Sequence, residues 1–435
     1  MELKKGRYYL TGGVDLLSLA DKYGCPLYVY DTAVIERQYK RLAGAFDVPK
    51  LQLNFACKSL SNVNILKFMN SLGAGLDAVS IQEVLLGLHA GFDPENISFT
   101  PNGVSIQEIV EAKNLGVKIN IDNLSILEQF GTMFPEYPVG IRINPHILAG
   151  GNINISTGHV DSKFGISFHQ LPLLLRIIEA TGQRVAGLHM HTGSDILDSE
   201  VFIQGADILL SVAKHFTDLS FINFGSGFKV SYNDDGIETD VEDLGDRIGE
   251  RFKAFCREYG KELTLIWEPG KYLVSESGLF LVKVNVVKQT TSTVFVGVDS
   301  GLNHLIRPML YNAYHKIENI SNTDGRQRIY TVVGYICETD TFGHNRKMHE
   351  VHEGDVLCIR NAGAYCFTMS SNYNSRYRPA EVMILGGKDY LIRNREDFED
   401  LIRNQVDLPN NIFSEACAMV NSKVEGQLAE GGNSA

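Results

Sequence analysis

The pattern of apolar and polar positions divides the chain into two regions. Between about residues 51 and 270, short β-rich apolar runs alternate with longer segments whose apolar residues repeat at helical spacing. This alternation predicts parallel strands joined by crossover helices. After Ser277, β-rich runs follow one another around polar turns, which predicts a second, mainly β domain.

The number of strands in the first region indicates its architecture. The strand candidates are 51–57, 75–79, 97–100, 118–122, 139–144, 185–191, 221–225 and 263–268. The helices predicted between them are 62–71, 81–89, 106–114, 124–133, 171–180, 200–215 and 243–259. Eight strands over about 220 residues predict a (β/α)8 TIM barrel, whose usual size is about 250 residues. A doubly wound sheet is the alternative, which spacing alone does not exclude.

The second region predicts the domain boundaries. A paired run, GLFLVKVNVVKQTTSTVFVGVDSG, begins at Gly278, and further β-rich runs are 328–336, 355–360 and 381–385. The run 24–31 precedes the barrel and is suited to donating a strand to the β domain. We therefore expect an α/β chain with the barrel at 32–277. Residues 1–31 and 278–420 form the β domain, and a flexible tail follows at 421–435.

Composition narrows the setting in which the protein works. The 435 residues include 44% hydrophobic and 21% charged residues, as in ordinary folded proteins. A formal net charge of -12 without a basic stretch argues against nucleic-acid binding. Seven cysteines without CxxC pairs fit a reducing cytoplasm. The opening residues lack a signal peptide's apolar core, and no apolar run reaches the ~18 residues of a spanning helix. We expect a cytoplasmic protein without membrane or nucleic-acid partners.

Lys58 is the first candidate for chemistry. It follows the apolar run NFAC at the carboxyl end of the first barrel strand, where barrel active sites lie. Taken alone, a lysine in this place is usually a solvated strand terminus. Inside a barrel mouth, burial would lower its pKa and free the neutral amine for imine formation.

Three further motifs end the last three barrel strands: HMHTGS, FGSGF and EPGK. Gly225 and Gly227 would let backbone N–H groups approach a phosphate, although a plain turn explains GSG equally well. Glu268 could keep a pyridine nitrogen protonated, or could be a surface carboxylate. His189 and His191 share a strand face and could bind a metal, but no further ligands suggest themselves.

Together these motifs resemble those of the fold-type III pyridoxal-phosphate-dependent decarboxylases of the alanine-racemase-like barrel group. Within that group the chain is most similar to the diaminopimelate decarboxylase family, from about residue 26 to residue 385. The resemblance implies a small amino-acid substrate, decarboxylation of meso-diaminopimelate to L-lysine, and a homodimer with its sites at the interface.

The same resemblance implies the residue roles. Lys58 would carry pyridoxal 5'-phosphate as a Schiff base, and Cys337 of CETD would return a proton to the substrate Cα, as a partner subunit's residue in the family. The cofactor-binding residues would be Lys58, Asp77, His191, Ser194, Gly227, Glu268, Gly270, Lys271 and Tyr365. The substrate-binding residues would be Lys271, Arg307, Tyr311, Glu338 and Tyr365. Arg142 and Lys163 would lie on the barrel wall.

Two departures and several alternatives bear on the substrate. Lys271 stands where the family usually has the arginine of EPGR, so the charge remains without the bidentate fork, and Ser226 replaces the middle glycine of GGG. Ornithine or arginine, carboxynorspermidine and a carrier-bound glutamyl group are alternative substrates. A racemase on the same barrel, a noncatalytic pyridoxal-phosphate-binding barrel and a metal-dependent barrel hydrolase are the other classes.

Overall fold

The computed structural model describes residues 1–147, 162–233 and 236–414. The tail expected at 421–435 lies outside these residues. The chain forms two compact units, Met1–Arg395 and Glu396–Ala435. The described part of the second unit contains the short helix α12 (Phe398–Ile402).

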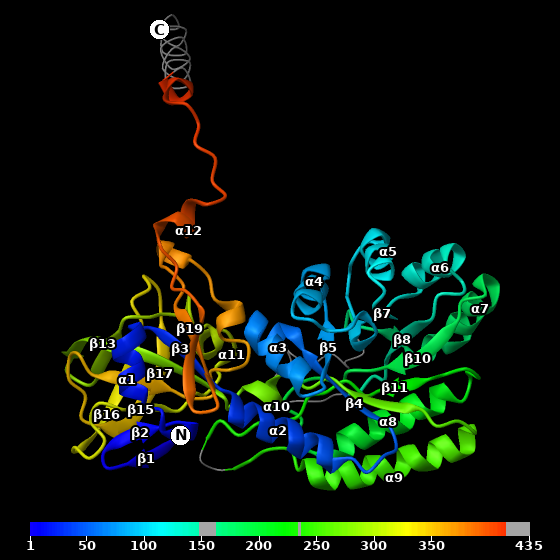
Figure 1. Ribbon diagram of the computed structural model, residues 1–435, viewed down its shortest axis with the longest axis horizontal. Helices are drawn as coiled ribbons and strands as arrows, with labels where there is room; N and C mark the ends of the chain where they lie inside the picture. Colours follow the sequence, from blue (N-terminus) through cyan, green and yellow to red (C-terminus); the bar gives the residue numbers. More distant parts are fainter. Residues whose placement is uncertain (148–161, 234–235, 415–435) are drawn as a thin grey trace, which may run out of the picture. The chain divides into compact units, whose positions relative to one another are not determined.

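Eight parallel strands form a closed barrel, as the sequence predicts (Figure 1). The ring closes because β10 pairs with β8 as well as with β11, and β12 pairs with β4. Closure excludes a doubly wound sheet, which has two free edges. The strands are β4 (Leu51–Ala56), β5 (Gly75–Ala78), β6 (Ile97–Phe99), β7 (Lys118–Ile121), β8 (Val139–Asn144), β10 (Val185–His189), β11 (Phe221–Asn223) and β12 (Thr264–Trp267). A short strand, β9 (Ile166–Ser167), pairs with β8 outside the ring.

Helices surround the barrel (Figure 1). They are α2 (Thr32–Ala45), α3 (Val63–Ser71), α4 (Ile81–His89), α5 (Ile106–Asn114), α6 (Leu124–Met133), α7 (Leu171–Thr181), α8 (Ser199–Ala213), α9 (Val241–Tyr259) and the short α10 (Lys271–Val274). Polar side chains begin several of them: Ser80 caps α4, Ser105 caps α5 and Asn123 caps α6, each by accepting a backbone N–H. These caps fix where each crossover helix starts after its strand.

The second sheet is the core of the β domain. Its main path runs β17, β16, β14, β13, β3, β19 and β20, and β18 pairs with both β13 and β15. The twelve-residue β13 pairs with β14, β18 and β3, so it connects most of the sheet. The strands are β3 (Leu27–Asp31), β13 (Gly278–Gln289), β14 (Val294–Val298), β15 (Ile317–Asn319), β16 (Gln327–Val333), β17 (Thr341–His349), β18 (Val356–Ile359), β19 (Ala380–Leu385) and β20 (Lys388–Arg393).

Smaller elements complete the first unit. The hairpin β1 (Glu2–Lys4) and β2 (Arg7–Tyr9) precedes α1 (Leu16–Tyr23), and α11 (Arg307–Tyr311) follows β14. The sequence did not predict these elements, nor α2, β15, β17 and β20. Within the described residues, no helix combines the length and apolar character that crossing a bilayer requires.

Two contacts join the β domain to the barrel segment that runs from the Lys58 turn to the start of α3. The backbone N–H of Tyr365 donates to the carbonyl oxygen of Ser59 at 2.9 Å. On the other side, the fully buried Glu381 of β19 accepts hydrogen bonds from Asn62 at 2.9 Å and from Tyr30 of β3 at 2.8 Å. Because Asn62 also caps α3, the β domain helps to fix the start of that helix.

Candidate active site

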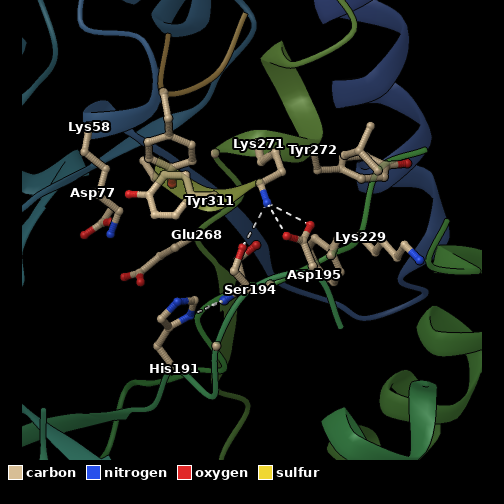
Figure 2. Close-up of a pocket in the computed structure, with 18 of the residues that line it drawn as sticks. Lys58, Asp77, His191, Ser194, Asp195, Lys229, Glu268, Lys271, Tyr272 and Tyr311 are labelled. Carbon is tan, nitrogen blue, oxygen red and sulfur yellow. Dashed lines mark hydrogen bonds and ion pairs between the residues drawn. The ribbon is translucent and has the colours of Figure 1, made fainter. Parts of the chain in front are cut away.

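A cavity of about 810 Å³ opens at the carboxyl ends of the barrel strands. Barrel residues line most of it, and Arg307, Tyr311 and Tyr365 of the β domain complete its wall. Figure 2 shows the side chains converging from these separate segments. The strand ends that the sequence singled out therefore meet in one place.

Lys58 lies in a short 3-10 turn, Cys57–Ser59, directly after β4 rather than on the strand itself. Its ammonium is 3.9 Å from a carboxylate oxygen of Asp77 on β5, and its side chain, 41% exposed, opens into the cavity. The expectation that burial lowers its pKa is wrong in net effect. Burial does oppose the charge, but the negative charge of Asp77, with smaller contributions from Tyr365 and Glu268, raises the pKa of Lys58 above its usual value.

Glu268 follows β12 and is buried, with its carboxylate facing the cavity. Its Oε2 lies 2.8 Å from Nε2 of His189, and its Oε1 accepts a hydrogen bond from the amide of Asn223 at 2.6 Å. Burial alone would raise its pKa, but His189 and Asn223 stabilise the anion and lower the pKa of Glu268 to about 2. The carboxylate is therefore ionised at neutral pH.

Asp77 contrasts with Glu268 across the same cavity. Burial and the nearby charge of Glu268 raise the pKa of Asp77 well above its usual value, and its Oδ1 is buried without a hydrogen-bond partner among the described residues. Two carboxyl groups with pKa values pushed in opposite directions are characteristic of a catalytic site. Glu268 is the fixed anion of the pair, and Asp77 is the carboxyl group whose pKa the site raises.

His191 presents a neutral ring to the cavity. Burial and the positive charges of Lys58 and Arg142 lower the pKa of His191 well below its usual value. Its Nδ1 accepts the backbone N–H of Ser226 at 3.2 Å, which orients the ring (Figure 2). A neutral imidazole held in this way offers a flat face to a bound ring.

Two glycine-containing turns lie against each other beside this ring. Gly227 has φ +131, and a Cβ there would lie 2.5 Å from the carbonyl oxygen of Gly193. The backbone N–H of Ile196 donates to the carbonyl oxygen of Gly227 at 2.9 Å. Only glycine permits this approach at residue 227, and it leaves Ser194 and Ser226 lining the cavity as a cradle suited to phosphate.

The β domain supplies a cation to the opposite wall. Arg307 is 6% exposed, and its Nη1 meets the hydroxyl of Tyr232 at 2.7 Å and Nε2 of His315 at 3.2 Å. Burial opposes its charge, but Tyr232 and Cys366 hold the pKa of Arg307 above its usual value. No carboxylate pairs with this guanidinium within the described part of the chain. A buried arginine of this kind is suited to an anionic ligand.

Some predicted site residues lie elsewhere. Cys337 and Glu338 are exposed and do not line the cavity. Cys337 Sγ accepts from the amide of Asn374 at 3.0 Å, and Glu338 accepts from the hydroxyl of Tyr373 at 2.5 Å. Lys163 also lies outside the lining, near the ring of Phe164. All other predicted cofactor and substrate residues line the cavity.

The sequence reasoning missed several residues that shape the site. Asp195, next to Ser194, pairs with Lys271 at 2.7 Å, and Tyr232 contacts Arg307. Asn223 and His189 orient Glu268, whereas the sequence had offered His189 only as a possible metal ligand. Asp195 directly follows the HMHTGS motif and could have been found there. Nothing in the sequence singled out Tyr232, which follows β11 by nine residues.

The residues in the cavity fit pyridoxal phosphate. Lys58 provides the amine, Glu268 an ionised carboxylate for the ring nitrogen, His191 a ring face, and the paired glycine turns a phosphate cradle. Within the described residues, no group of three or more His, Cys, Asp or Glu side chains is arranged to hold a metal ion.

Comparison with known proteins agrees with this chemistry. Residues 32–275 match the family model described as "Pyridoxal-dependent decarboxylase, pyridoxal binding domain". The diaminopimelate decarboxylase of Methanothermobacter thermautotrophicus is 38% identical over 93% of this chain and 97% of its own length. The Helicobacter pylori diaminopimelate decarboxylase structure, a complex with L-lysine, is 33% identical with a TM-score of 0.82, covering 89% of this chain and 98% of that one. The structure of the M. jannaschii diaminopimelate decarboxylase with L-lysine is 31% identical with a TM-score of 0.85, covering 94% of this chain and 98% of that one.

The closed barrel, its lysine-bearing cavity and the separate β domain define a pyridoxal-phosphate-dependent carboxy-lyase. The chain belongs to the diaminopimelate decarboxylase family.

Proposed function

We propose that this protein decarboxylates meso-diaminopimelate to L-lysine and CO2. The observation that supports this substrate most directly is Arg307, a buried cation on the cavity wall without a carboxylate partner among the described residues. A substrate with a second carboxylate, remote from the reacting carbon, would supply that partner. L-Lysine, which keeps this carboxylate, is the ligand named in the Helicobacter pylori and M. jannaschii structures.

The side chains divide the work of the reaction. Bound pyridoxal phosphate supplies a ring that accepts the electron pair left on Cα when CO2 departs. Glu268 is placed to keep the ring nitrogen protonated, because its own pKa is held at about 2. Lys58 is placed to hold the cofactor between turnovers and to give way to the substrate amine. Arg307, with Tyr311 and Tyr365 beside it, would orient the remote end of the substrate.

We further propose that the working enzyme is a homodimer in which Cys337 and Glu338 complete the partner's cavity. Cys337 would return a proton to the substrate Cα, and Glu338 would bind the remote ammonium. Both residues are exposed on a loop that the carboxylate of Asp340 holds by accepting the backbone N–H groups of Leu302 and Ile336. Light scattering should give about twice the chain mass for the active species. A monomer with full activity would contradict this arrangement.

Location is part of the same proposal. Cys25, Cys57, Cys256, Cys337, Cys358 and Cys366 are all free thiols, which fits a reducing cytoplasm. Cell fractionation should recover the protein with cytoplasmic markers.

A substrate panel tests the proposed reaction. Purified protein loaded with pyridoxal phosphate would be assayed for CO2 release from meso-diaminopimelate, ornithine, arginine and carboxynorspermidine. We expect meso-diaminopimelate to exceed ornithine and arginine, which lack the remote carboxylate, by about 10²–10⁴-fold in kcat/KM, since a site built to bind a polar group rejects ligands lacking it. Comparable turnover of ornithine or arginine would overturn the assignment.

A further inference from the structure

Lys271 is fully engaged by its own chain. Its ammonium lies 2.7 and 2.8 Å from the two carboxylate oxygens of Asp195 and 3.2 Å from the hydroxyl of Ser194 (Figure 2). A lysine ammonium has three N–H donors, and three acceptors meet it here. The side chain of Lys271 is 9% exposed, so little of it is left for a substrate.

The partner residues of Lys271 belong to the turn that would hold the cofactor phosphate. Asp195 adopts φ +59, between Ser194 and Ile196, and the N–H of Ile196 is bound to the carbonyl oxygen of Gly227. Because Gly227 also lies directly against Gly193, the Lys271–Asp195 pair braces both halves of the glycine cradle. Loss of one partner would leave the other as a poorly compensated, partly buried charge in this turn.

Arg307 differs from Lys271 in its partners. Its Nη1 meets the neutral groups of Tyr232 and His315, and no carboxylate neutralises it within the described residues. The guanidinium has five N–H donors in a planar fork, which matches the geometry of a carboxylate. Of these two cations, Arg307 is therefore the one whose charge remains available to a ligand.

We propose that Asp195 and Lys271 form a fixed pair that positions the cofactor-phosphate turn, so that Lys271, unlike Arg307, takes no part in binding the remote substrate carboxylate. This assignment rests on the proposed function for its substrate and names Asp195 as a positioning residue. It assigns the positioning of the cofactor-phosphate turn to Lys271 and the binding of the substrate carboxylate to Arg307, two tasks that a positive charge at residue 271 could otherwise combine.

Binding measurements on five variants test this separation: Lys271→Gln, Asp195→Asn, the double variant, Arg307→Gln and Arg307→Lys. Two quantities are measured for each. The first is the dissociation constant of pyridoxal phosphate from the reconstituted protein. The second is the ratio of dissociation constants for 1,5-diaminopentane and L-lysine, followed through the absorbance of the bound cofactor. These two ligands differ only by the carboxylate, so the ratio reports carboxylate recognition.

The wild-type ratio should be about tenfold or more, and Arg307→Gln should bring it close to one, because a charge-assisted hydrogen bond is lost. Lys271→Gln and Asp195→Asn should each weaken pyridoxal phosphate binding about tenfold and change the ratio by less than about threefold. The double variant should lose much less than the two single losses combined, as expected for residues acting as a pair. Arg307→Lys keeps the charge but loses the planar fork, so it should also lower the ratio. It replaces Arg307→Gln in the test if that variant does not fold.

Three results would overturn the proposal. Lys271→Gln could bring the ratio as close to one as Arg307→Gln does, which would make Lys271 a substrate-binding residue. The cofactor losses of the single variants could instead be additive, or the Arg307 variants could leave the ratio unchanged. A wild-type ratio of one would refute the carboxylate receptor together with the proposed substrate, while the cofactor data would still decide whether Lys271 and Asp195 act as a pair.

Discussion

The barrel and the β domain contribute to the cavity in different ways. The barrel brings its residues together by closure, because the carboxyl ends of its strands meet at one face and Lys58, Asp77, His191 and Glu268 follow from that geometry. The β domain contributes Arg307, Tyr311 and Tyr365 to the same cavity but leaves Cys337 and Glu338 outside it. The cofactor chemistry is thus contained in one barrel, whereas the residues proposed for proton return and for the remote ammonium require another surface.

Replacement of Lys58 by alanine should have the largest effect, because it removes the amine that holds the cofactor. We expect activity to fall by about a thousandfold or more, together with loss of the visible absorption of the bound cofactor. Spectra and CO2 release measured on the same sample check both results. Lys67→Ala, at an exposed position on α3, is the matched control and should keep both. A visible band that survives in Lys58→Ala and is bleached by borohydride would contradict the assignment.

Glu268→Gln tests whether the barrel site depends on charge rather than shape. The amide keeps the size of the side chain but cannot stabilise a protonated ring nitrogen, so kcat should fall about a hundredfold with a smaller change in KM. Steady-state kinetics measure both values. Glu276→Gln, which removes an exposed ion pair with Arg37, is the control and should stay near wild type. A kcat within about threefold of wild type would show that Glu268 acts only in packing.

Mixing two inactive variants tests whether the β domain acts in the partner's cavity. Refolded together, Lys58→Ala and Cys337→Ala chains should recover about a quarter of wild-type activity, because heterodimers place one intact cavity beside one doubly defective cavity. Lys58→Ala mixed with Glu268→Gln is the control and should not recover, since both residues line the cavity of their own chain. Equal recovery in both mixtures, or none in the first, would contradict sharing between subunits.

The barrel and the β domain also differ in how well the sequence predicts them. Every strand and helix proposed for the barrel is present, because each is a local apolar run whose period and caps are readable. In the β domain, β17 was missed: its sequence, TFGHNRKMH, is largely polar because several of its side chains face solvent. Local pattern cannot reveal a strand that is held mainly by its neighbours.

The site shows a similar limit. Motifs at the strand ends predicted Lys58 and Glu268, but the net direction of the Lys58 pKa could not be read from burial alone. That direction depends on Asp77, which approaches only when β5 pairs beside β4. The Lys271–Asp195 pair likewise joins residues 76 positions apart. Contacts of this range follow from closure of the barrel, and sequence spacing does not contain them.

Glu381 binds Asn62 of the barrel, and a hydrogen bond from Tyr30 within the β domain holds the same carboxylate; loss of the Tyr30 bond should have a moderate effect on stability. Tyr30→Phe removes a hydrogen bond to the buried carboxylate of Glu381, so we expect unfolding to become easier by about 1.5–3 kcal/mol with kcat unchanged. Denaturant titration measures the loss. Tyr28→Phe, on the same strand, removes a bond to the neutral carbonyl of His304 and should cost only about 0.5–1.5 kcal/mol. A Tyr30→Phe loss no larger than that of Tyr28→Phe would show that Glu381 is adequately held by Asn62 and Arg393 alone.

The smallest expected effect concerns pH and lies in the β domain. Burial and the charge of Arg307 lower the pKa of His315 to about 3 from its usual 6.5. Between these values the unfolded chain binds a proton that the folded chain does not, so this histidine makes the protein less stable as pH falls below about 6.5. The contribution of His315 to the slope of unfolding free energy against pH is at most about 1.4 kcal/mol per pH unit. His315→Gln keeps an acceptor for Arg307 but has no ring to protonate. Between pH 6 and pH 4 the slope of its unfolding free energy against pH should therefore be smaller than that of wild type, by the equivalent of up to one proton taken up on unfolding. His352→Gln, at an exposed site, is the control. An unchanged slope in His315→Gln would mean that His315 is protonated in the folded protein, and that Arg307 has a charged rather than a neutral neighbour.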